Sequence, residues 1–127
     1  MEKIYTILIV DDVEHNLFLI SNYLQELNPA YNILGAPNGK NALLVLQHET
    51  PDLIISDWEM PVMSGIELLR ELKSKESTQD IPVMMITGQR TRADDLKFAF
   101  DAGAIDFIRK PVNQIELWAR VGDFAAF

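Results

Sequence analysis

The sequence predicts an α/β domain built on a doubly wound, five-stranded parallel sheet, and two observations support this fold class. Five strand-like apolar runs alternate strictly with five helical patterns along the 127 residues. Each parallel crossover requires a helix, so this alternation places helices on both faces of one sheet. The first run is apolar nearly throughout instead of at every second residue, as expected for a central strand covered on both faces.

The first two strand–helix units follow each other without a linker. The first strand covers residues 4–10, and the next segment repeats apolar residues at steps of three and four until Asn28-Pro29 stops the pattern. A short second strand covers residues 31–35, and Asn38-Gly39 provides a turn and an N-cap for the second helix. The apolar positions of these two helices are Leu17, Ile20, Leu24, Leu27, Ala42, Val45 and Leu46.

The third unit carries the most informative residue of the chain. Its strand covers residues 53–56 and ends at Asp57, which places a carboxylate at the end of a buried strand. Ser64, with Glu67 three residues later, forms a capping box that begins the third helix. The inner face of that helix contains Ile66, Leu69 and Leu72.

The last two units repeat the order. The fourth strand covers residues 83–86 and ends at Thr87, and Gly103 ends the helix that follows, since glycine accepts the left-handed conformation. The fifth strand covers residues 105–109, and residues 113–116 give a cap signal for the last helix. The apolar positions of these helices are Leu96, Phe100, Leu117, Val121 and Phe124.

Polar residues follow four of these strands where a parallel sheet would bring them together. They are Asp11 and Asp12, Asp57, Thr87 and Lys110. In doubly wound sheets, ligands lie beyond the carboxyl ends of the strands, where the strand order reverses. For the order 2-1-3-4-5 this point lies between the first and third strands. The long spacing from Asp12 to Asp57 leaves room for an extra strand and two helices, whereas the spacing from Asp57 to Thr87 fits one repeat.

Three carboxylates at this edge require a cation. At about 5 Å and an effective dielectric constant of about 20, each pair repels by about 3 kcal/mol. Hard oxygen ligands without histidine or cysteine favour Mg²⁺, with Mn²⁺ as the alternative. A carboxylate can also attack phosphorus and form an acyl phosphate. The metal and a lysine would then neutralise the phosphoryl oxygens, and the Thr87 hydroxyl would donate to them.

Composition argues against several other classes of protein. The formal net charge of −8 repels phosphate backbones and anionic lipids, so we expect neither nucleic-acid nor membrane binding. Without cysteine the chain has no disulfide framework and no thiol nucleophile, which favours an intracellular protein. Neither a secretory signal pattern nor an apolar span long enough for a bilayer occurs. We therefore expect a cytoplasmic protein with protein or cation partners.

Four motifs occur in the order that one known family shows. They are Ile9-Val10-Asp11-Asp12, then Asp57 with Met60-Pro61 and Gly65, then Thr87-Gly88, and finally Ala102-Gly103-Ala104 with Asp106-Phe107 and Lys110-Pro111. With them the chain resembles the receiver domain of the two-component response-regulator family over essentially all 127 residues. The resemblance implies a flavodoxin-like receiver fold over residues 1–127, with no effector domain in this chain. It also implies a phosphoacceptor switch of a phosphorelay that catalyses only its own phosphorylation and dephosphorylation and is otherwise not an enzyme.

The resemblance assigns the acceptor and the metal ligands. Asp57 would take the phosphoryl group from a sensor histidine kinase or a phosphotransfer protein. Asp12, Asp57 and the main-chain carbonyl of Glu59 would hold Mg²⁺, and Asp11 would contribute through water. No organic cofactor is implied. Glu59 stands at a position that varies across the family, and such variation usually alters the lifetime of the phosphate.

The resemblance also assigns the phosphoryl contacts and the switch. Thr87 and Lys110 would bind the phosphoryl group, and the Lys110–Pro111 bond would be cis. Phe107 matches an aromatic position that turns inward when the threonine moves. The output surface would comprise the fourth helix, fifth strand and fifth helix, which would meet an effector domain, another protein or a second copy of the chain.

Other interpretations of the same residues are weaker. Each polar residue alone could be a helix cap or a turn residue, but their occurrence at four strand ends argues against coincidence. A haloacid-dehalogenase-type phosphatase would carry Asp-x-Asp where this chain reads Asp57-Trp58-Glu59. A flavodoxin-like cofactor binder would need a phosphate-binding loop where Asp11-Asp12 stands. The complete set of five site residues argues against a receiver that is insensitive to phosphate. The sequence leaves open whether the chain is a stand-alone receiver or the N-terminal piece of a longer regulator.

Overall fold

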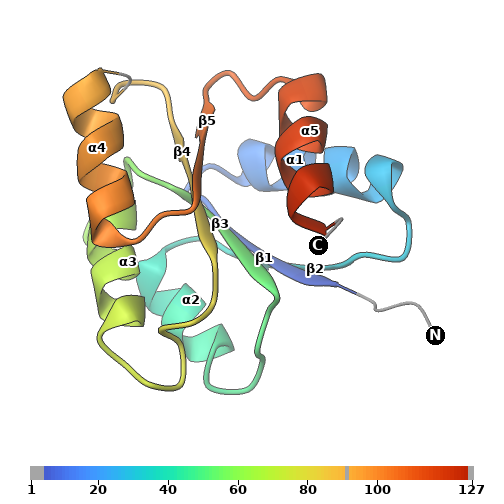
Figure 1. The fold of residues 1–127 in the computed structure, drawn as a ribbon. Helices are drawn as coiled ribbons and strands as arrows, with labels where there is room; N and C mark the ends of the chain where they lie inside the picture. Colours follow the sequence, from blue (N-terminus) through green and yellow to red (C-terminus); the bar gives the residue numbers. More distant parts are fainter. Residues whose placement is uncertain (1–4, 91, 126–127) are drawn as a thin grey trace.

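The structure, a computed structural model, describes residues 5–90 and 92–125 and consists of five strands that alternate with five helices (Figure 1). The alternation predicted from the sequence is confirmed. The strands are β1 (Thr6–Val10), β2 (Asn32–Ala36), β3 (Leu53–Asp57), β4 (Val83–Thr87) and β5 (Asp106–Arg109). The helices are α1 (Glu14–Leu27), α2 (Gly39–Val45), α3 (Gly65–Lys73), α4 (Ala93–Ala102) and α5 (Gln114–Ala125).

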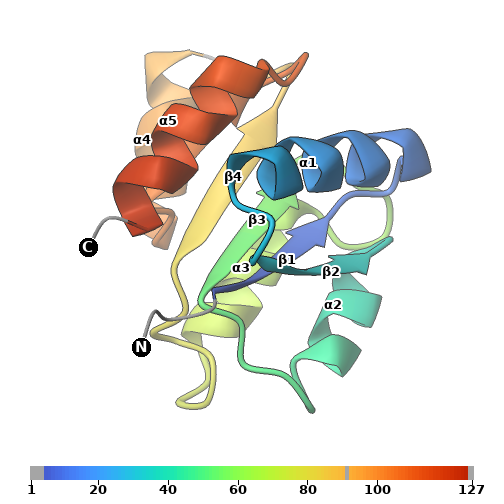
Figure 2. The ribbon, with the colours of Figure 1, turned by 90° about the vertical axis from the view of Figure 1, so that its right-hand side faces the viewer.

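All strands lie parallel in one sheet of order β2-β1-β3-β4-β5, as the sequence predicts. The order reverses between β1 and β3, where Val10 pairs with Ser56, so Asp11 and Asp57 continue from neighbouring strand ends. Helices α1 and α5 cover one face of the sheet, and α2, α3 and α4 cover the other (Figures 1 and 2). Both faces are therefore dry, which explains why the strands are apolar nearly throughout.

Each face of the sheet has its own apolar core. Under α1 and α5 the strand residues pack against Ile20, Leu24, Leu117 and Val121, all of them fully buried. Under α2, α3 and α4 the opposite side chains of the same strands pack against Ala42, Ile66, Leu68, Leu69, Leu72 and Ala99. Burial at about 25 cal/mol per Å² of apolar surface makes these two layers the main favourable contribution to folding.

The predicted caps are present. The Asn38 side chain accepts a hydrogen bond from the Asn41 amide, and Ser64 and Glu67 form a complete capping box at the start of α3. Gly103 ends α4 with φ at 114°, in the left-handed region that glycine tolerates. These local signals fix helix ends, and the helices therefore begin and end close to where the sequence predicts.

Small differences occur at strand boundaries. β2 begins at Asn32 instead of residue 31 because Tyr31 belongs to the preceding turn and buries its ring edge-on against Tyr5, with centroids 6.4 Å apart. The predicted first strand includes residue 4, which lies outside the described residues. Within residues 5–90 and 92–125, no helix is long and apolar enough to cross a membrane.

Candidate functional site

The carboxyl ends of β1 and β3 bring three carboxylates together. Asp11 and Asp12 follow β1 and Asp57 ends β3, and one oxygen of each lies within 4.8 Å of the others. Asp11 and Asp57 are each 1% exposed, whereas Asp12 is exposed to solvent. A compact acidic group with two buried members and one open member is thus accessible from outside the sheet edge.

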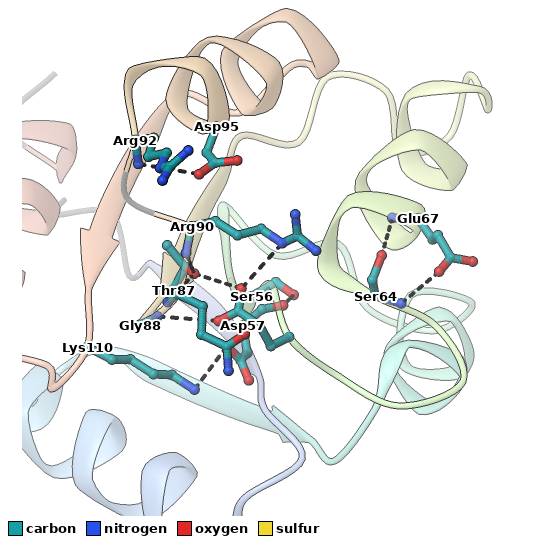
Figure 3. Close-up of polar contacts among 12 residues, drawn as sticks. Ser56, Asp57, Ser64, Glu67, Thr87, Gly88, Arg90, Arg92, Asp95 and Lys110 are labelled. Atoms are coloured by element: carbon teal, nitrogen blue, oxygen red, sulfur yellow. Dashed lines mark hydrogen bonds and ion pairs between the residues drawn. The ribbon is translucent and has the colours of Figure 1, made fainter.

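Lys110 supplies the positive charge of this group. Its main-chain amide donates to the Thr87 carbonyl at 2.8 Å, which ties the end of β5 to the end of β4. The Lys110 side chain then reaches across the sheet edge, with Nζ 2.9 Å from Asp57 Oδ1 and 3.7 Å from Asp11 Oδ2 (Figure 3). The Lys110–Pro111 bond is cis, as the resemblance implies.

One lysine does not compensate all of the negative charge. Burial raises the pKa of Asp57 to about 6 and also raises the pKa of Asp11, even though Lys110 acts in the opposite direction. Burial lowers the pKa of Lys110. The hydrogen bond to Asp57 and the surrounding carboxylate charges raise this pKa by more than burial lowers it, so the net shift is upward. The site therefore holds more negative charge than its protein partners stabilise.

Two buried carboxylate oxygens of this group suit a divalent cation. Among the described residues, Asp11 Oδ2 and Asp57 Oδ1 accept no well-directed hydrogen bond, and both face the Lys110 ammonium, at 3.7 and 2.9 Å. Buried polar atoms without such partners are costly. Hard carboxylate oxygens within a few ångströms of one another are the ligands that Mg²⁺ and Mn²⁺ prefer. The donor set therefore fits a hard cation.

Thr87, at the end of β4, is held in a defined orientation. Its hydroxyl oxygen accepts the amide hydrogens of Gln89 and Arg90 at 3.2 and 3.0 Å. The hydroxyl proton is donated to Oε2 of Glu59 at 2.7 Å, and the Gly88 amide donates to Oε1 of the same side chain at 3.3 Å. Figure 3 shows Thr87, Gly88 and Arg90 gathered beside Asp57 at the sheet edge.

An aromatic cluster lies behind the site. Phe107 on β5 is 6% exposed and meets the Trp58 ring edge-on, with centroids 6.0 Å apart. Trp58 stacks on Phe98 of α4 at 6.3 Å, and the Arg90 guanidinium lies 5.3 Å from the centroid of the Trp58 ring. The residue next to Asp57 is therefore in contact with α4 and β5.

The predicted site residues differ in how directly the structure joins them. Asp11, Asp12, Asp57 and Lys110 form one cluster, and Thr87 lies on the adjacent strand end. Sequence reasoning assigned Glu59 only through its main-chain carbonyl and missed the contact of its side chain with Thr87. It also missed Arg90. The available signal was a charged residue, Glu59, in the turn directly after a strand-end carboxylate.

Comparisons with known proteins were made on sequence and on structure. The family model for the response regulator receiver domain matches residues 7–122. The response regulator PleD of Caulobacter vibrioides is 36% identical over 121 residues, which are 95% of this chain and 26% of PleD. The chemotaxis protein CheY of Pseudomonas aeruginosa is 37% identical over 105 residues, which are 83% of each protein.

Structural comparison gives the same result. A crystal structure of a response regulator from Chloroflexus aurantiacus superposes with a TM-score of 0.87 at 30% identity and covers 98% of this chain and 100% of that one. The chain spans about a quarter of the length of PleD. The match of residues 7–122 to the family model shows that this chain belongs to the response regulator receiver domain family.

Proposed function

We propose that this domain is a phosphorylation-controlled switch whose phosphoacceptor is Asp57. The observation that carries the proposal is the placement of Asp57, which is buried at the reversal point of the sheet, with Lys110 at 2.9 Å and two further carboxylates beside it. A carboxylate that is held next to a cation and only partly compensated is suited to nucleophilic attack on phosphorus.

The reaction is a transfer from a phosphohistidine of a sensor kinase or phosphotransfer protein. An Asp57 oxygen attacks phosphorus, a P–O bond forms, and the P–N bond of the donor breaks. The imidazole nitrogen leaves with the bonding electron pair and takes up a proton. Lys110 stabilises the phosphoryl charge, and the Thr87 hydroxyl and the Gly88 amide are donors for its oxygens.

Asp12, Asp57 and the main-chain carbonyl of Glu59 would hold Mg²⁺, with Asp11 acting through water. When bound, Mg²⁺ neutralises charge on the phosphoryl oxygens. Mn²⁺ is the alternative ion. The domain catalyses only its own phosphorylation and dephosphorylation. We also propose that it acts in the cytoplasm.

The downstream partner binds the surface formed by α4, β5 and α5. Phosphorylation draws Thr87 toward the phosphoryl group, and Phe107 responds behind β4. Three basic residues lie on this surface. Lys97 forms an ion pair with Asp101, and Arg120 forms one with Asp106. Arg109 is exposed to solvent. The partner is an effector domain, a separate protein or a second copy of this chain.

The proposal is tested by intact-mass measurement after incubation with acetyl phosphate and Mg²⁺. The parent should gain one phosphoryl group, with Asp57 attacking phosphorus and acetate leaving. Asp57→Asn should gain none, and omission of Mg²⁺ should abolish labelling of the parent. Undiminished labelling of Asp57→Asn would place the nucleophile elsewhere.

A further inference from the structure

The side chain of Glu59 occupies the two donors that the proposed function assigns to the phosphoryl group. Its Oε2 accepts from the Thr87 hydroxyl at 2.7 Å and its Oε1 accepts from the Gly88 amide at 3.3 Å. The side chain is 23% exposed, so these contacts are largely shielded from water. A carboxylate and a phosphoryl group are both anions with several acceptor oxygens and therefore compete for the same donors.

The Thr87 hydroxyl cannot serve both anions. A hydroxyl has one proton to donate, and here its oxygen already accepts from the Gln89 and Arg90 amides. These two contacts fix the direction of the proton, which points to Glu59. A phosphoryl group on Asp57 can accept the Thr87 proton only after the Glu59 carboxylate has moved away.

The displaced carboxylate has a cationic partner nearby. Arg90 Nε lies 4.0 Å from Glu59 Oε2, and the Arg90 guanidinium is held over the Trp58 ring at 5.3 Å from its centroid. An open hollow of about 380 Å³ lies beside these groups. Its lining consists of Trp58, Glu59, Met60, Ser64 and Arg90. A rotation of the Glu59 side chain into this hollow would keep its charge next to Arg90.

We propose that Glu59 is a gate for phosphoryl entry. Its carboxylate competes with the incoming phosphoryl group for the Thr87 hydroxyl and the Gly88 amide, and it turns toward Arg90 when the acyl phosphate forms on Asp57. This inference rests on the proposed function and adds a specificity-determining side chain to it. The gate limits how readily the site accepts an anion of phosphoryl shape.

The test compares Glu59→Ala and Glu59→Asp with the parent. Both substitutions keep the main-chain carbonyl of residue 59, the proposed Mg²⁺ ligand. Aspartate keeps the charge but is one methylene shorter and loses its reach to Thr87 and Gly88. Asp94→Asn, which removes a charge from the exposed first turn of α4, is the matched control.

Two measurements use the full chain with Mg²⁺: the affinity for beryllofluoride by fluorine NMR, and the rate of labelling by acetyl phosphate. A gate that acts by contact predicts about tenfold tighter binding and faster labelling for both Glu59→Ala and Glu59→Asp, the effect of losing about one charge-assisted hydrogen bond. Asp94→Asn should match the parent. The Gly88 amide resonance should shift in both Glu59 variants before any phosphoryl mimic is added.

Three outcomes would overturn the gate. Equal affinities in the parent and both Glu59 variants would show that the contact does not compete with phosphate. An effect in Glu59→Ala with Glu59→Asp like the parent would assign the effect to charge alone. Failure of the parent and all variants to bind beryllofluoride or to be labelled would overturn the proposed function, and the gate with it.

Discussion

At the scale of single residues, Asp57 is the clearest case of a side chain whose chemistry opposes folding. It is 1% exposed, and burial raises its pKa to about 6 from a usual value of 3.8. The folded protein therefore binds a proton at Asp57 more tightly than the unfolded chain does. The resulting stability is fully present below about pH 4 and is lost as pH rises through 6.

This linkage predicts a pH-dependent difference between the parent and Asp57→Asn. Without metal at about pH 7, the variant should be more stable by about 3 kcal/mol, since the pKa of Asp57 lies about two units above its usual value and each unit corresponds to about 1.4 kcal/mol. The difference should shrink as pH falls through 6 toward 4. Urea unfolding in the presence of a chelator measures it. A difference that does not change with pH would show that the Asp57 charge is not destabilising.

Val62, in the loop after β3, carries backbone strain. Its φ is 70°, which a β-branched residue rarely adopts, and the Met63 amide donates to the Pro61 carbonyl across it at 2.8 Å. The side chain is 82% exposed and contributes little burial. Strain of this kind costs about 1–3 kcal/mol.

Val62→Gly should therefore raise the free energy of unfolding by about 1 kcal/mol, after the entropic cost of glycine is subtracted. The matched control is Ile115→Gly. Ile115 is a β-branched residue within α5 that is 74% exposed and has no positive φ, so glycine relieves no strain there and should destabilise the helix. Urea unfolding at constant Mg²⁺ compares the two. Destabilisation by both substitutions would contradict the strain at Val62.

At the scale of elements, β4 and β5 form the connection between the site and the rest of the surface. Thr87 ends β4 beside Asp57, and Phe107 lies in β5, which pairs with β4 along its length. Trp58 joins these strands to α4 by stacking on Phe98, and Arg70 of α3 lies 5.1 Å from the centroid of the Phe98 ring. A continuous series of side-chain contacts thus connects β5 and the end of β3 with α4 and α3.

Thr87→Ala should separate phosphorylation from this response. The variant should still be labelled at Asp57 because the nucleophile and Lys110 remain, but the NMR shifts around Phe107 on adding beryllofluoride should fall to a minor part of those in the parent. A phosphoryl group biases a two-state element only through its differential contacts, and Thr87 provides one of them.

Thr78→Ala is the control for this experiment. Thr78 is also a buried threonine and lies in the loop after α3. Its hydroxyl donates to the Leu72 carbonyl of α3 at 2.7 Å and does not contact the site residues. It should keep the full response of Phe107. Equal responses in Thr87→Ala and the parent would remove Thr87 from the coupling.

At the scale of the whole molecule, the site is unfavourable to folding and is tolerated because two apolar layers stabilise the sheet from both sides. Asp12 allows a test of this balance because it is the exposed member of the carboxylate cluster. Asp12→Ala removes repulsion, which solvent screens, and should leave the metal-free protein unchanged or more stable by up to about 1 kcal/mol.

The same substitution should lower Mg²⁺ affinity by at least about tenfold, or about 1.4 kcal/mol. In the parent, Mg²⁺ at about 100 times its dissociation constant should add about 2.7 kcal/mol of stability, and in Asp12→Ala most of this increment should vanish. Thermal melts with and without Mg²⁺ show both effects. An undiminished Mg²⁺ increment in Asp12→Ala would exclude Asp12 as a ligand.

Much of this architecture could be predicted from the sequence because it depends on local patterns. Strand runs, helix periodicity and caps specify the elements, and parallel connectivity then brings Asp57 and Asp11 together without knowledge of any contact. The direction of the Glu59 side chain could not be predicted. It depends on Thr87, which is 28 residues away and on another strand, and no periodicity encodes such a contact.

Gly65 sets which parts of the site can move. Its amide donates to the Trp58 carbonyl at 2.9 Å, and a Cβ at this position would collide with the main-chain oxygen of Asp57 and lie 2.9 Å from Trp58 Cα. The first turn of α3 is therefore seated directly on the chain that carries the acceptor. On the β3–α3 side, the backbone at Asp57 and Trp58 is thus packed too closely for any side chain to intervene, whereas the Lys110 side chain reaches the carboxylate from the end of β5. We infer that the close approach at Gly65 leaves the β4–β5 side as the part of the site that responds to a phosphoryl group.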